Sequence, residues 1–581
     1  MAGAAAGRGS GGDGWTPARS VAGTRNPWTI IAVISIATFM TTLDASIVNV
    51  ALDHIAGALS VSYDEATWVT TSFLIATAAI IPISGWLANV LGRKRYYMMS
   101  VALFTLASFA CGVAPNLSLL ILARVIQGIG GGGLAAVEQS MLVDTFPPRQ
   151  RGLAFAAYGI VVIAGPIAGP ILGGYITDNA SWQWCFLINV PVGALSLFLV
   201  QSFVNEPQAL KDDRRRLLEG GLRIDMVGFV LVVLFFGCLE FTLDRGQRLD
   251  WFSSPTITAT AVISALALIL FIPWELTREA PIVPITMFGR RNFGIASIFL
   301  MLTGVILFGT TLFIPQLLQT VMGYTATDAG LALTAGGAAT IIAMPLVGIL
   351  SSRVDPRLLI GGAFLVQGLA LMYMGHLDTD MTFADAARAR MFQAVGIPFL
   401  FVPISLIAYV GLKPEESNQA SAMMNVARNL GGTIGISSVQ TILAQRQQFH
   451  QARLVEGLDP LNPNYAGGLA RLTQGLVDQG QSMVDAPRQA LATLYATAQR
   501  QAAMLSYLDV FHVLMIVIFA SIPLLLFMRG PQAQGLQGAR GGVKPRGPRV
   551  GPALGLADGA SRPWTTGWQP LLFRPRPGGT K

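Results

Sequence analysis

The sequence predicts an all-α integral membrane protein, and two observations indicate this: its composition and the recurrence of long apolar runs. Of the 581 residues, 52% are hydrophobic and 12% are charged, whereas soluble domains carry about 25% charged residues. Runs of about 20 apolar residues, the length that crosses a bilayer, recur through the chain. We therefore expect a lipid bilayer to surround most of the protein.

About fourteen apolar runs are long enough to span the membrane. They lie near residues 28–51, 66–88, 96–114, 117–140, 153–176, 183–204, 226–244, 256–275, 293–318, 327–350, 357–376, 388–411, 420–443 and 507–528. An Arg-x-x-Gln-x-x-Gly pattern begins at Arg124 and recurs 266 residues later at Arg390. Such a parallel repeat fits two similar bundles that face each other across a cavity at the membrane midplane. We expect two six-helix bundles, at 28–205 and 293–528, and two extra helices in the linker 206–292.

The distribution of Lys and Arg predicts the orientation of these helices. If the N-terminus is cytoplasmic, the cytoplasmic loops contain Arg93, Lys94, Arg95, Arg149, Arg151, Lys211, Arg214, Arg215, Arg216, Arg223, Arg278, Arg290, Arg291, Arg353, Arg357 and Lys413. The opposite short loops contain Arg245, Arg248 and Arg388. Since cytoplasmic loops carry the excess of basic residues, both termini are expected in the cytoplasm.

The segments outside the spans differ in character. Residues 1–27 are rich in Gly, Ala and Ser and are expected to form a disordered cytoplasmic arm. Because they lack the apolar core of a signal peptide, the first span is expected to be the insertion signal. Residues 529–581 are rich in Gly, Pro and Arg and are expected to form a disordered basic tail. This tail carries most of the formal net charge of +8, so the charge is no argument for a nucleic-acid partner.

One loop, at residues 444–506, is long and polar and lies outside the membrane on the side opposite the termini. After Asp485-Ala486-Pro487, which is a helix start signal, Leu491, Leu494, Ala498 and Leu505 follow at helical spacing. The segment is either a solvated hairpin or the docking surface of a partner, and the spacing alone favours neither.

Two ionisable residues lie deep within predicted spans. Asp44 is in the first span, and Arg124 is in the fourth, with Gln127 one turn away on the same face. A carboxylate in a membrane helix costs about 2.5–3.5 kcal/mol unless it is protonated or paired. Desolvation favours its neutral form, and a nearby Arg favours its charged form. Asp44 and Arg124 are therefore candidates for proton coupling, and the alternative is a structural pair.

Three more charged residues lie within or near the ends of spans, namely Glu138, Glu240 and Arg428. Glu138 could lie at the cytoplasmic interface and Glu240 at the outer one, whereas Arg428 is deeper. We expect all three to contribute to proton coupling, and we expect Asn49, Gln127 and Asn425 to line a substrate cavity.

Two glycine-rich motifs accompany these residues. The first, at the cytoplasmic end of a span, contains Gly85, Asn89, Gly92 and Arg93. The second, inside the fifth span, contains Gly165, Pro166, Gly169, Pro170, Gly173 and Gly174. Glycines at every fourth position let helix backbones approach closely, while each proline removes a backbone hydrogen bond. The second motif thus predicts a bent and tightly packed helix.

These motifs, with Arg124-x-x-Gln127-x-x-Gly130 between them, resemble motifs A, B and C of the major facilitator superfamily. From residue 28 to about 528 the chain is similar to the fourteen-helix drug/proton antiporter branch, and within it to the EmrB/QacA-like multidrug efflux permeases. The resemblance implies the major facilitator fold and proton-driven efflux of lipophilic or amphipathic compounds. The alternative is proton-coupled uptake of a small organic solute on the same fold, which motif C and the extra helices oppose.

The resemblance also implies a location and partners. Proteins of the EmrB type lie in the inner membrane and work with a periplasmic membrane-fusion adaptor and an outer-membrane channel, which favours docking for residues 444–506. The chain departs from the family at Asn89, where motif A usually has an Asp with a gating role. The gate is then expected to depend on hydrogen bonds.

Neither a metal, a cofactor nor an enzymatic activity is expected. The histidines are His54, His376, His450 and His512, and the cysteines are Cys111, Cys185 and Cys238. Neither set has the spacing of a metal site or of a catalytic nucleophile with its base.

Overall fold

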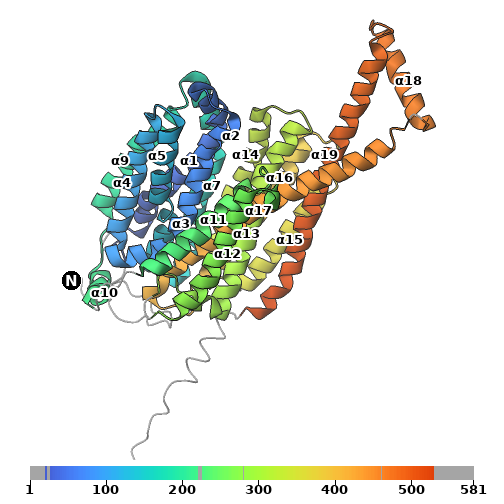
Figure 1. The fold of residues 1–581 in the computed structure, drawn as a ribbon. Helices are drawn as coiled ribbons and strands as arrows, with labels where there is room; N and C mark the ends of the chain where they lie inside the picture. Colours follow the sequence, from blue (N-terminus) through green and yellow to red (C-terminus); the bar gives the residue numbers. More distant parts are fainter. Residues whose placement is uncertain (1–19, 23–25, 220–224, 279–280, 460, 529–581) are drawn as a thin grey trace, which may run out of the picture. The chain divides into compact units, whose positions relative to one another are not determined.

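The computed structural model describes residues 20–22, 26–219, 225–278, 281–459 and 461–528. Most of the expected N-terminal arm and the whole of the expected basic tail lie outside these ranges. The described residues form helices and connecting turns, without a β-strand (Figure 1). The prediction of an all-α membrane protein is confirmed.

The N-terminal bundle contains six spans. They are α1 (Pro27–Leu59), α3 (Trp68–Leu91), α4 (Arg93–Gly112), the bent pair α5 (Leu117–Gly131) and α6 (Leu134–Thr145), α7 (Pro148–Asn179) and α9 (Asn189–Phe203), with short helices α2 (Tyr63–Ala66) and α8 (Trp184–Leu187). The bend between α5 and α6 lies in a run of glycines. A Cβ at Gly130 would lie 2.7 Å from the backbone nitrogen of Phe104 in α4, so the run lets the fourth span touch its neighbour backbone to backbone.

The C-terminal bundle repeats this plan. Its spans are α13 (Arg291–Thr320), α14 (Ala326–Leu350), α15 (Pro356–Met374), α16 (Phe383–Ala408), α17 (Ser417–Glu456) and α19 (Ala486–Ser521), with 3-10 turns η3 (Ile285–Gly289), η4 (Pro414–Glu416) and η5 (Ile522–Phe527). Among the described residues, 12 helices are long and apolar enough to cross a membrane. The other two expected spans are α4, which begins with three basic residues, and α17, which is rich in Ser, Asn and Gln.

The linker between the bundles contains α10 (Gln208–Glu219), α11 (Met226–Arg245), η2 (Trp251–Ser253) and α12 (Pro255–Leu276). Helices α11 and α12 pack against each other, and α11 also packs along α3 of the first bundle and α17 of the second. Helix α11 therefore lies along the line where α3 and α17 meet.

The two bundles are in close contact at one end, which we call the Asn89 end. A Cβ at Gly85 in α3 would lie 2.8 Å from the carbonyl oxygen of Asn418 in α17. The bundles meet along two seams, the first between α3 and α17 and the second between α7 and α14. In the second seam, a Cβ at Gly348 in α14 would lie 2.9 Å from the Cα of Leu153 in α7. Farther along α7, a Cβ at Gly174 would meet no heavy atom within 4 Å. The bundles are thus closed at the Asn89 end.

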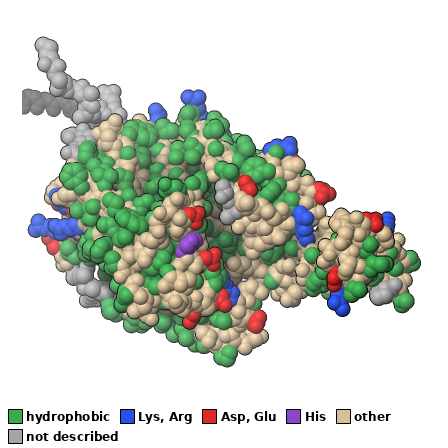
Figure 2. All heavy atoms as spheres, turned by 90° about the horizontal axis from the view of Figure 1, so that it is seen from above, with side chains coloured by type: hydrophobic (Ala, Val, Ile, Leu, Met, Phe, Trp, Pro, Cys, Tyr) green, Lys and Arg blue, Asp and Glu red, His purple; other side chains and the backbone are tan. Residues whose placement is uncertain are grey.

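At the opposite end, which we call the α18 end, a hairpin projects beyond the bundles (Figure 1). It consists of the end of α17, α18 (Pro463–Asp478) and the start of α19. Asp509 of α19 accepts hydrogen bonds from Arg446 at 2.5 Å and from His450 at 2.6 Å, both in α17. These bonds hold the base of the hairpin together. The surface of the hairpin carries charges of both signs, whereas hydrophobic side chains cover much of the bundles (Figure 2).

Candidate functional site

A buried polar cluster surrounds Asp44 in the middle of the N-terminal bundle. The Asp44 carboxylate accepts hydrogen bonds from Arg124 Nη1 at 2.6 Å and from Gln127 Nε2 at 2.9 Å. All three side chains are fully buried. A buried ion pair needs additional hydrogen bonds to offset the cost of desolvating its two charges, and a second amide supplies one of them.

That second donor is Asn189 in α9, whose Nδ2 donates to Asp44 Oδ1 at 2.8 Å. Asn189 and Gln127 also donate to the hydroxyl of Ser108 in α4, at 3.0 and 3.1 Å. The sequence analysis did not select Asn189 or Ser108. The available signal was an uncharged amide within an apolar span, which does not reveal that the helix faces Asp44.

Besides its bond to Asp44, Arg124 contacts two residues of α3. Its Nε donates to the carbonyl oxygen of Val69 at 2.9 Å, and its guanidinium carbon lies 4.2 Å from the centre of the Phe73 ring. Nη2 has no hydrogen-bond partner among the described residues. The structure therefore brings Asp44 and Arg124 together, and the guanidinium retains a free donor inside the bundle.

Gln127, which we expected to line a substrate cavity, belongs to this cluster in the described conformation. Its side chain is fully buried, and both its amide oxygen and its amide nitrogen form hydrogen bonds within the bundle. Asn49, also expected in the cavity, is exposed on α1, where it donates to the carbonyl of Ala45 and accepts from Thr70.

Glu138 in α6 is fully buried, so it does not lie at a membrane interface as the sequence allowed. Its Oε2 accepts a short hydrogen bond from Thr38 Oγ1, and the Tyr158 hydroxyl lies 3.2 Å from the same Thr38 oxygen. Oε1 has no hydrogen-bond partner among the described residues. A carboxyl group with one unsatisfied oxygen is costly to bury in its charged form.

Glu240 in α11 is also buried, with 8% of its surface exposed. Thr433 in α17 donates to its carboxylate at 2.9 Å. Four residues along α11, Asp244 accepts a 2.6 Å hydrogen bond from Thr71 in α3. One inserted helix is thus bonded to both bundles, and Glu240 lies between helices rather than at the outer interface.

Asn425 connects α17 to α6, and Arg428 lies one turn farther along α17. Asn425 donates to Gln139 Oε1 at 3.0 Å and accepts from Arg428 Nη2 at 2.7 Å. The half-buried Arg428 guanidinium lies 5.7 Å from the centre of the Phe401 ring. These bonds place the expected cavity residue Asn425 on the contact between the bundles.

At the Asn89 end, hydrogen bonds join α3 and α6 to the start of α17. Asn418 donates to Asn89 Oδ1, and Ser140 Oγ donates to Asn418 Oδ1 at 2.5 Å. Arg93 is buried, donates to Ser417 Oγ at 2.9 Å and forms an ion pair with Asp144. The first glycine-rich motif therefore lies on a closed contact that uses amide and hydroxyl groups. Gly92, at its turn, has a φ of +88° that favours glycine.

The second glycine-rich motif packs α7 against α1. A Cβ at Gly165 would lie 2.1 Å from Thr42 Oγ1, one at Gly169 would lie 2.5 Å from Ser46 Cβ, and one at Gly173 would lie 3.0 Å from Ile47. Ser46 also donates to the carbonyl oxygen of Pro166 at 3.2 Å, and Pro170 lies one turn farther along the same helix. Gly174 has open space, so the stripe is formed by the other three glycines.

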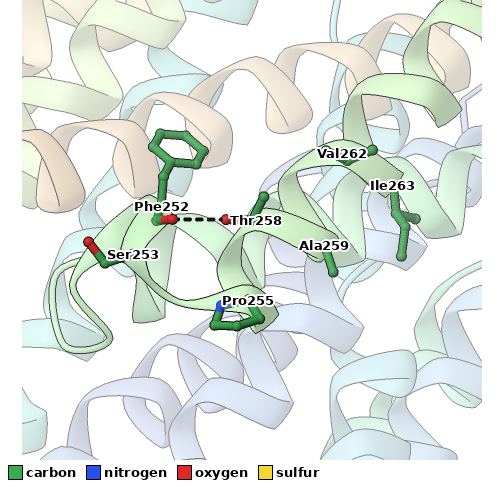
Figure 3. A pocket seen from close by; sticks show the side chains of 7 residues that line it. All are labelled: Phe252, Ser253, Pro255, Thr258, Ala259, Val262 and Ile263. Carbon is green, nitrogen blue, oxygen red and sulfur yellow. Dashed lines mark hydrogen bonds between the residues drawn. The ribbon is translucent and has the colours of Figure 1, made fainter.

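The structure contains a hollow of about 550 Å³ outside these clusters. It lies on the outer face of η2 and α12 and is lined by Phe252, Ser253, Pro255, Thr258, Ala259, Val262 and Ile263 (Figure 3). Thr258 bonds to the backbone of Phe252 there. The hollow lies on neither bundle seam and holds no charged side chain, so it is not the site that the buried charges indicate.

Comparisons with known proteins agree with this architecture. The family model described as Major Facilitator Superfamily matches residues 34–436. The chain is 41% identical over 433 residues to the multidrug export protein EmrB of Escherichia coli (strain K12), covering 74% of this chain and 83% of that protein. It is 35% identical over 500 residues to the multidrug export protein EmrB of Haemophilus influenzae, covering 84% and 95%.

Among solved structures, the proton:xylose symporter XylE, bound to 6-bromo-6-deoxy-D-glucose, is similar in fold. The TM-score is 0.55 at 12% sequence identity, over 85% of this chain and 95% of that one. At this identity the likeness shows the fold alone. With the family match and the two EmrB relatives, it establishes that the chain belongs to the major facilitator superfamily, in which it is EmrB-like.

Proposed function

We propose that the protein exports hydrophobic or amphipathic small molecules in exchange for protons, by alternating access. Its similarity to proteins named as multidrug exporters supports the direction and the substrate class. The single observation that carries the proton step is the fully buried ion pair of Asp44 with Arg124.

The geometry of that pair provides a means of coupling. In the described conformation Arg124, Gln127 and Asn189 together stabilise the charged carboxylate of Asp44. Protonation of Asp44 would leave the Arg124 guanidinium buried without a counter-charge, which is costly in a membrane. Uptake of a proton is therefore linked to a rearrangement of the helices, and its release to the return.

Glu138, Glu240 and Arg428 are proposed as further coupling residues. Glu138 has an unsatisfied carboxyl oxygen, and Glu240 bonds across to α17, so the proton occupancy of each depends on how the helices pack. Arg428 provides a positive charge on α17 beside Asn425. We propose that Asn425, Asn49 and Gln127 line the substrate path when the bundles move.

The orientation follows from the loop charges. We propose that the Asn89 end faces the cytoplasm, with both termini there, and that the α18 end faces the periplasm from the inner membrane. Alternating access then requires the hydrogen bonds of Asn89 and Arg93 to α17 to break when the cytoplasmic side opens.

The hairpin is proposed to dock a periplasmic membrane-fusion adaptor that leads to an outer-membrane channel. The turns at the two ends of α18 expose apolar side chains, with Leu461 at 88% and Met483 at 82% exposure. The neighbouring Val484 and, on α19, Leu491 are also exposed. Apolar groups on a projecting helical surface are typical of a partner site.

Replacing residues 457–485 by a Gly/Ser linker of equal length is expected to abolish drug resistance while leaving insertion and drug binding intact. The bonds of Arg446 and His450 to Asp509 lie below the replaced segment and are retained. Resistance of whole cells and drug binding to the purified protein are the measurements. Photocrosslinkers at the exposed Gln489 and Thr493 should capture the adaptor. Full resistance in the linker variant without crosslinks would show that the hairpin is a connector.

Asn89→Asp is expected to shift the balance between the two open states without raising the transport rate. A carboxylate at this position would accept the Asn418 amide as a charge-assisted hydrogen bond, which is stronger than a neutral one. The cytoplasmic contact should become harder to open, as measured by spin-label distances across α3 and α17. Asn89→Leu, which removes the bond, is the matched control and should shift the distances oppositely. A large gain in transport rate in Asn89→Asp would contradict a functional native gate.

Proton release from the purified protein tests the proposed exchange. Adding a panel of lipophilic compounds to protein in weak buffer should release protons for the compounds that are transported. Co-transport of proton and solute in the same direction, measured in proteoliposomes, would instead indicate uptake.

A further inference from the structure

The Arg-x-x-Gln-x-x-Gly repeat places a second buried guanidinium in the C-terminal bundle. Arg390 in α16 is 6% exposed. Its Nη1 donates to Gln393 Oε1 at 2.5 Å, just as Arg124 Nη1 donates to Gln127 Oε1 at 2.7 Å. The two bundles therefore contain the same Arg–Gln pair at equivalent places.

The repeat differs at the residue that faces this pair. The position 266 residues after Asp44 is Thr310 in α13. Arg390 Nη1 and Gln393 Nε2 both donate to Thr310 Oγ1, each at 3.2 Å. These contacts reproduce those that Arg124 and Gln127 make with Asp44. A neutral hydroxyl thus lies where the N-terminal bundle has its carboxylate.

The consequence is a buried cation without a counter-charge. Among the described residues, every ion pair joins other groups, and Arg390 forms none. An Arg side chain does not lose its proton in a protein. A buried charge that lacks a partner is unfavourable, so this cluster is electrostatically incomplete.

The free donors of Arg390 lie on one edge of its guanidinium. Nε has no hydrogen-bond partner, and Nη2 donates to the partly buried Thr311 Oγ1 at 3.1 Å. Nε and Nη2 form the edge that binds a carboxylate through two parallel hydrogen bonds. Gly336 of α14 faces this edge, where a Cβ would lie 3.1 Å from Nε. A larger residue there would crowd the donor edge.

We propose that Arg390, with Thr310, Thr311 and Gln393, forms an anion-binding site in the C-terminal bundle. Its ligand is one small monoanionic group, which supplies the charge that Asp44 supplies in the N-terminal bundle. The group comes either from a free halide or from the carboxylate head of an amphipathic molecule. Only the second source rests on the proposed export function.

The test is ligand binding to the full-length protein in lipid nanodiscs. The probes are chloride, with gluconate as the counter-anion, and decanoate, with decanol as its uncharged analogue. In Arg390→Gln, binding of the anion should weaken at least ten-fold, with decanol unchanged. Thr310→Asp keeps the guanidinium and gives it an internal carboxylate, so it should weaken binding to a similar extent even if Arg390→Gln folds poorly.

Arg388→Gln is the matched control. It removes a positive charge from the same helix, but at a side chain that is 68% exposed and paired with Asp385, so anion binding should stay within two-fold of the original.

Each outcome is decisive. Arg390-dependent binding of chloride, or of decanoate alone, supports the site and identifies the source of its anion. If neither probe binds, or if Thr310→Asp leaves binding within two-fold, the proposal is overturned. Compound-induced proton release, measured on the same samples, reports on the export function separately.

Discussion

Asp44→Asn is expected to abolish compound-driven proton exchange while leaving membrane insertion intact. The amide retains the shape of the side chain and can still accept from Arg124, but it cannot take up a proton. It also removes the counter-charge from a guanidinium that is fully buried. Proton flux in proteoliposomes, with compound added on one side, measures the effect, and we expect a loss of at least a hundred-fold.

The chain offers a matched control on the same helix. Asp53 lies nine residues along α1 and is exposed, so Asp53→Asn changes the net charge equally without touching the cluster. It should retain normal exchange. If Asp44→Asn exchanged protons at the original rate, Asp44 would be only a structural partner of Arg124.

Gly169→Val is expected to stop transport by separating α7 from α1. A Cβ at this position would lie 2.5 Å from both Cβ and Oγ of Ser46, and 3.1 Å from the backbone nitrogen of Ile47. The nearby atoms belong to the first turn beyond Asp44, so they cannot move without displacing that helix. Overpacking of this kind costs about 1–3 kcal/mol. We expect the protein still to fold and insert at this cost, but the displacement of α1 should move Asp44 and so stop transport.

Gly174→Val provides the comparison for this result. It introduces the same side chain into the same helix, where a Cβ would meet nothing within 4 Å. Efflux and passive proton leak should be close to normal in Gly174→Val, whereas Gly169→Val should show lost efflux or increased leak. Equal behaviour of the two variants would mean that contact with α1 is not what the stripe provides.

The sequence predicted the fold and part of the polar cluster for identifiable reasons. Long apolar runs require membrane helices, and the costs of burying Asp44 and Arg124 are large enough that each needed a partner. Asn189 and Ser108 could not be found in the same way, because an amide or hydroxyl within a span carries little cost and their role depends on how α9 and α4 face Asp44.

Burial was harder to predict for residues near the ends of spans. Glu138 and Glu240 could have been at membrane interfaces by their positions along the chain, but both are covered by neighbouring helices. For Glu240 the covering helix is α17, about 190 residues later, and no periodicity within α11 reports on a contact so distant. Long-range packing, rather than local pattern, decided these cases.

The position of α11 across the contact of α3 with α17 has a consequence for lipids. Two seams separate the bundles, and a lipophilic compound dissolved in the bilayer could enter sideways through either. The inserted helix α11 lies over the first seam, between α3 and α17, where Glu240 and Asp244 bond it to both helices. The second seam, between α7 and α14, is packed closely where a Cβ at Gly348 would lie 2.9 Å from the Cα of Leu153 and one at Gly337 would lie 2.0 Å from Ile167. We therefore expect α11 to hinder the lateral entry of a lipophilic compound along the first seam.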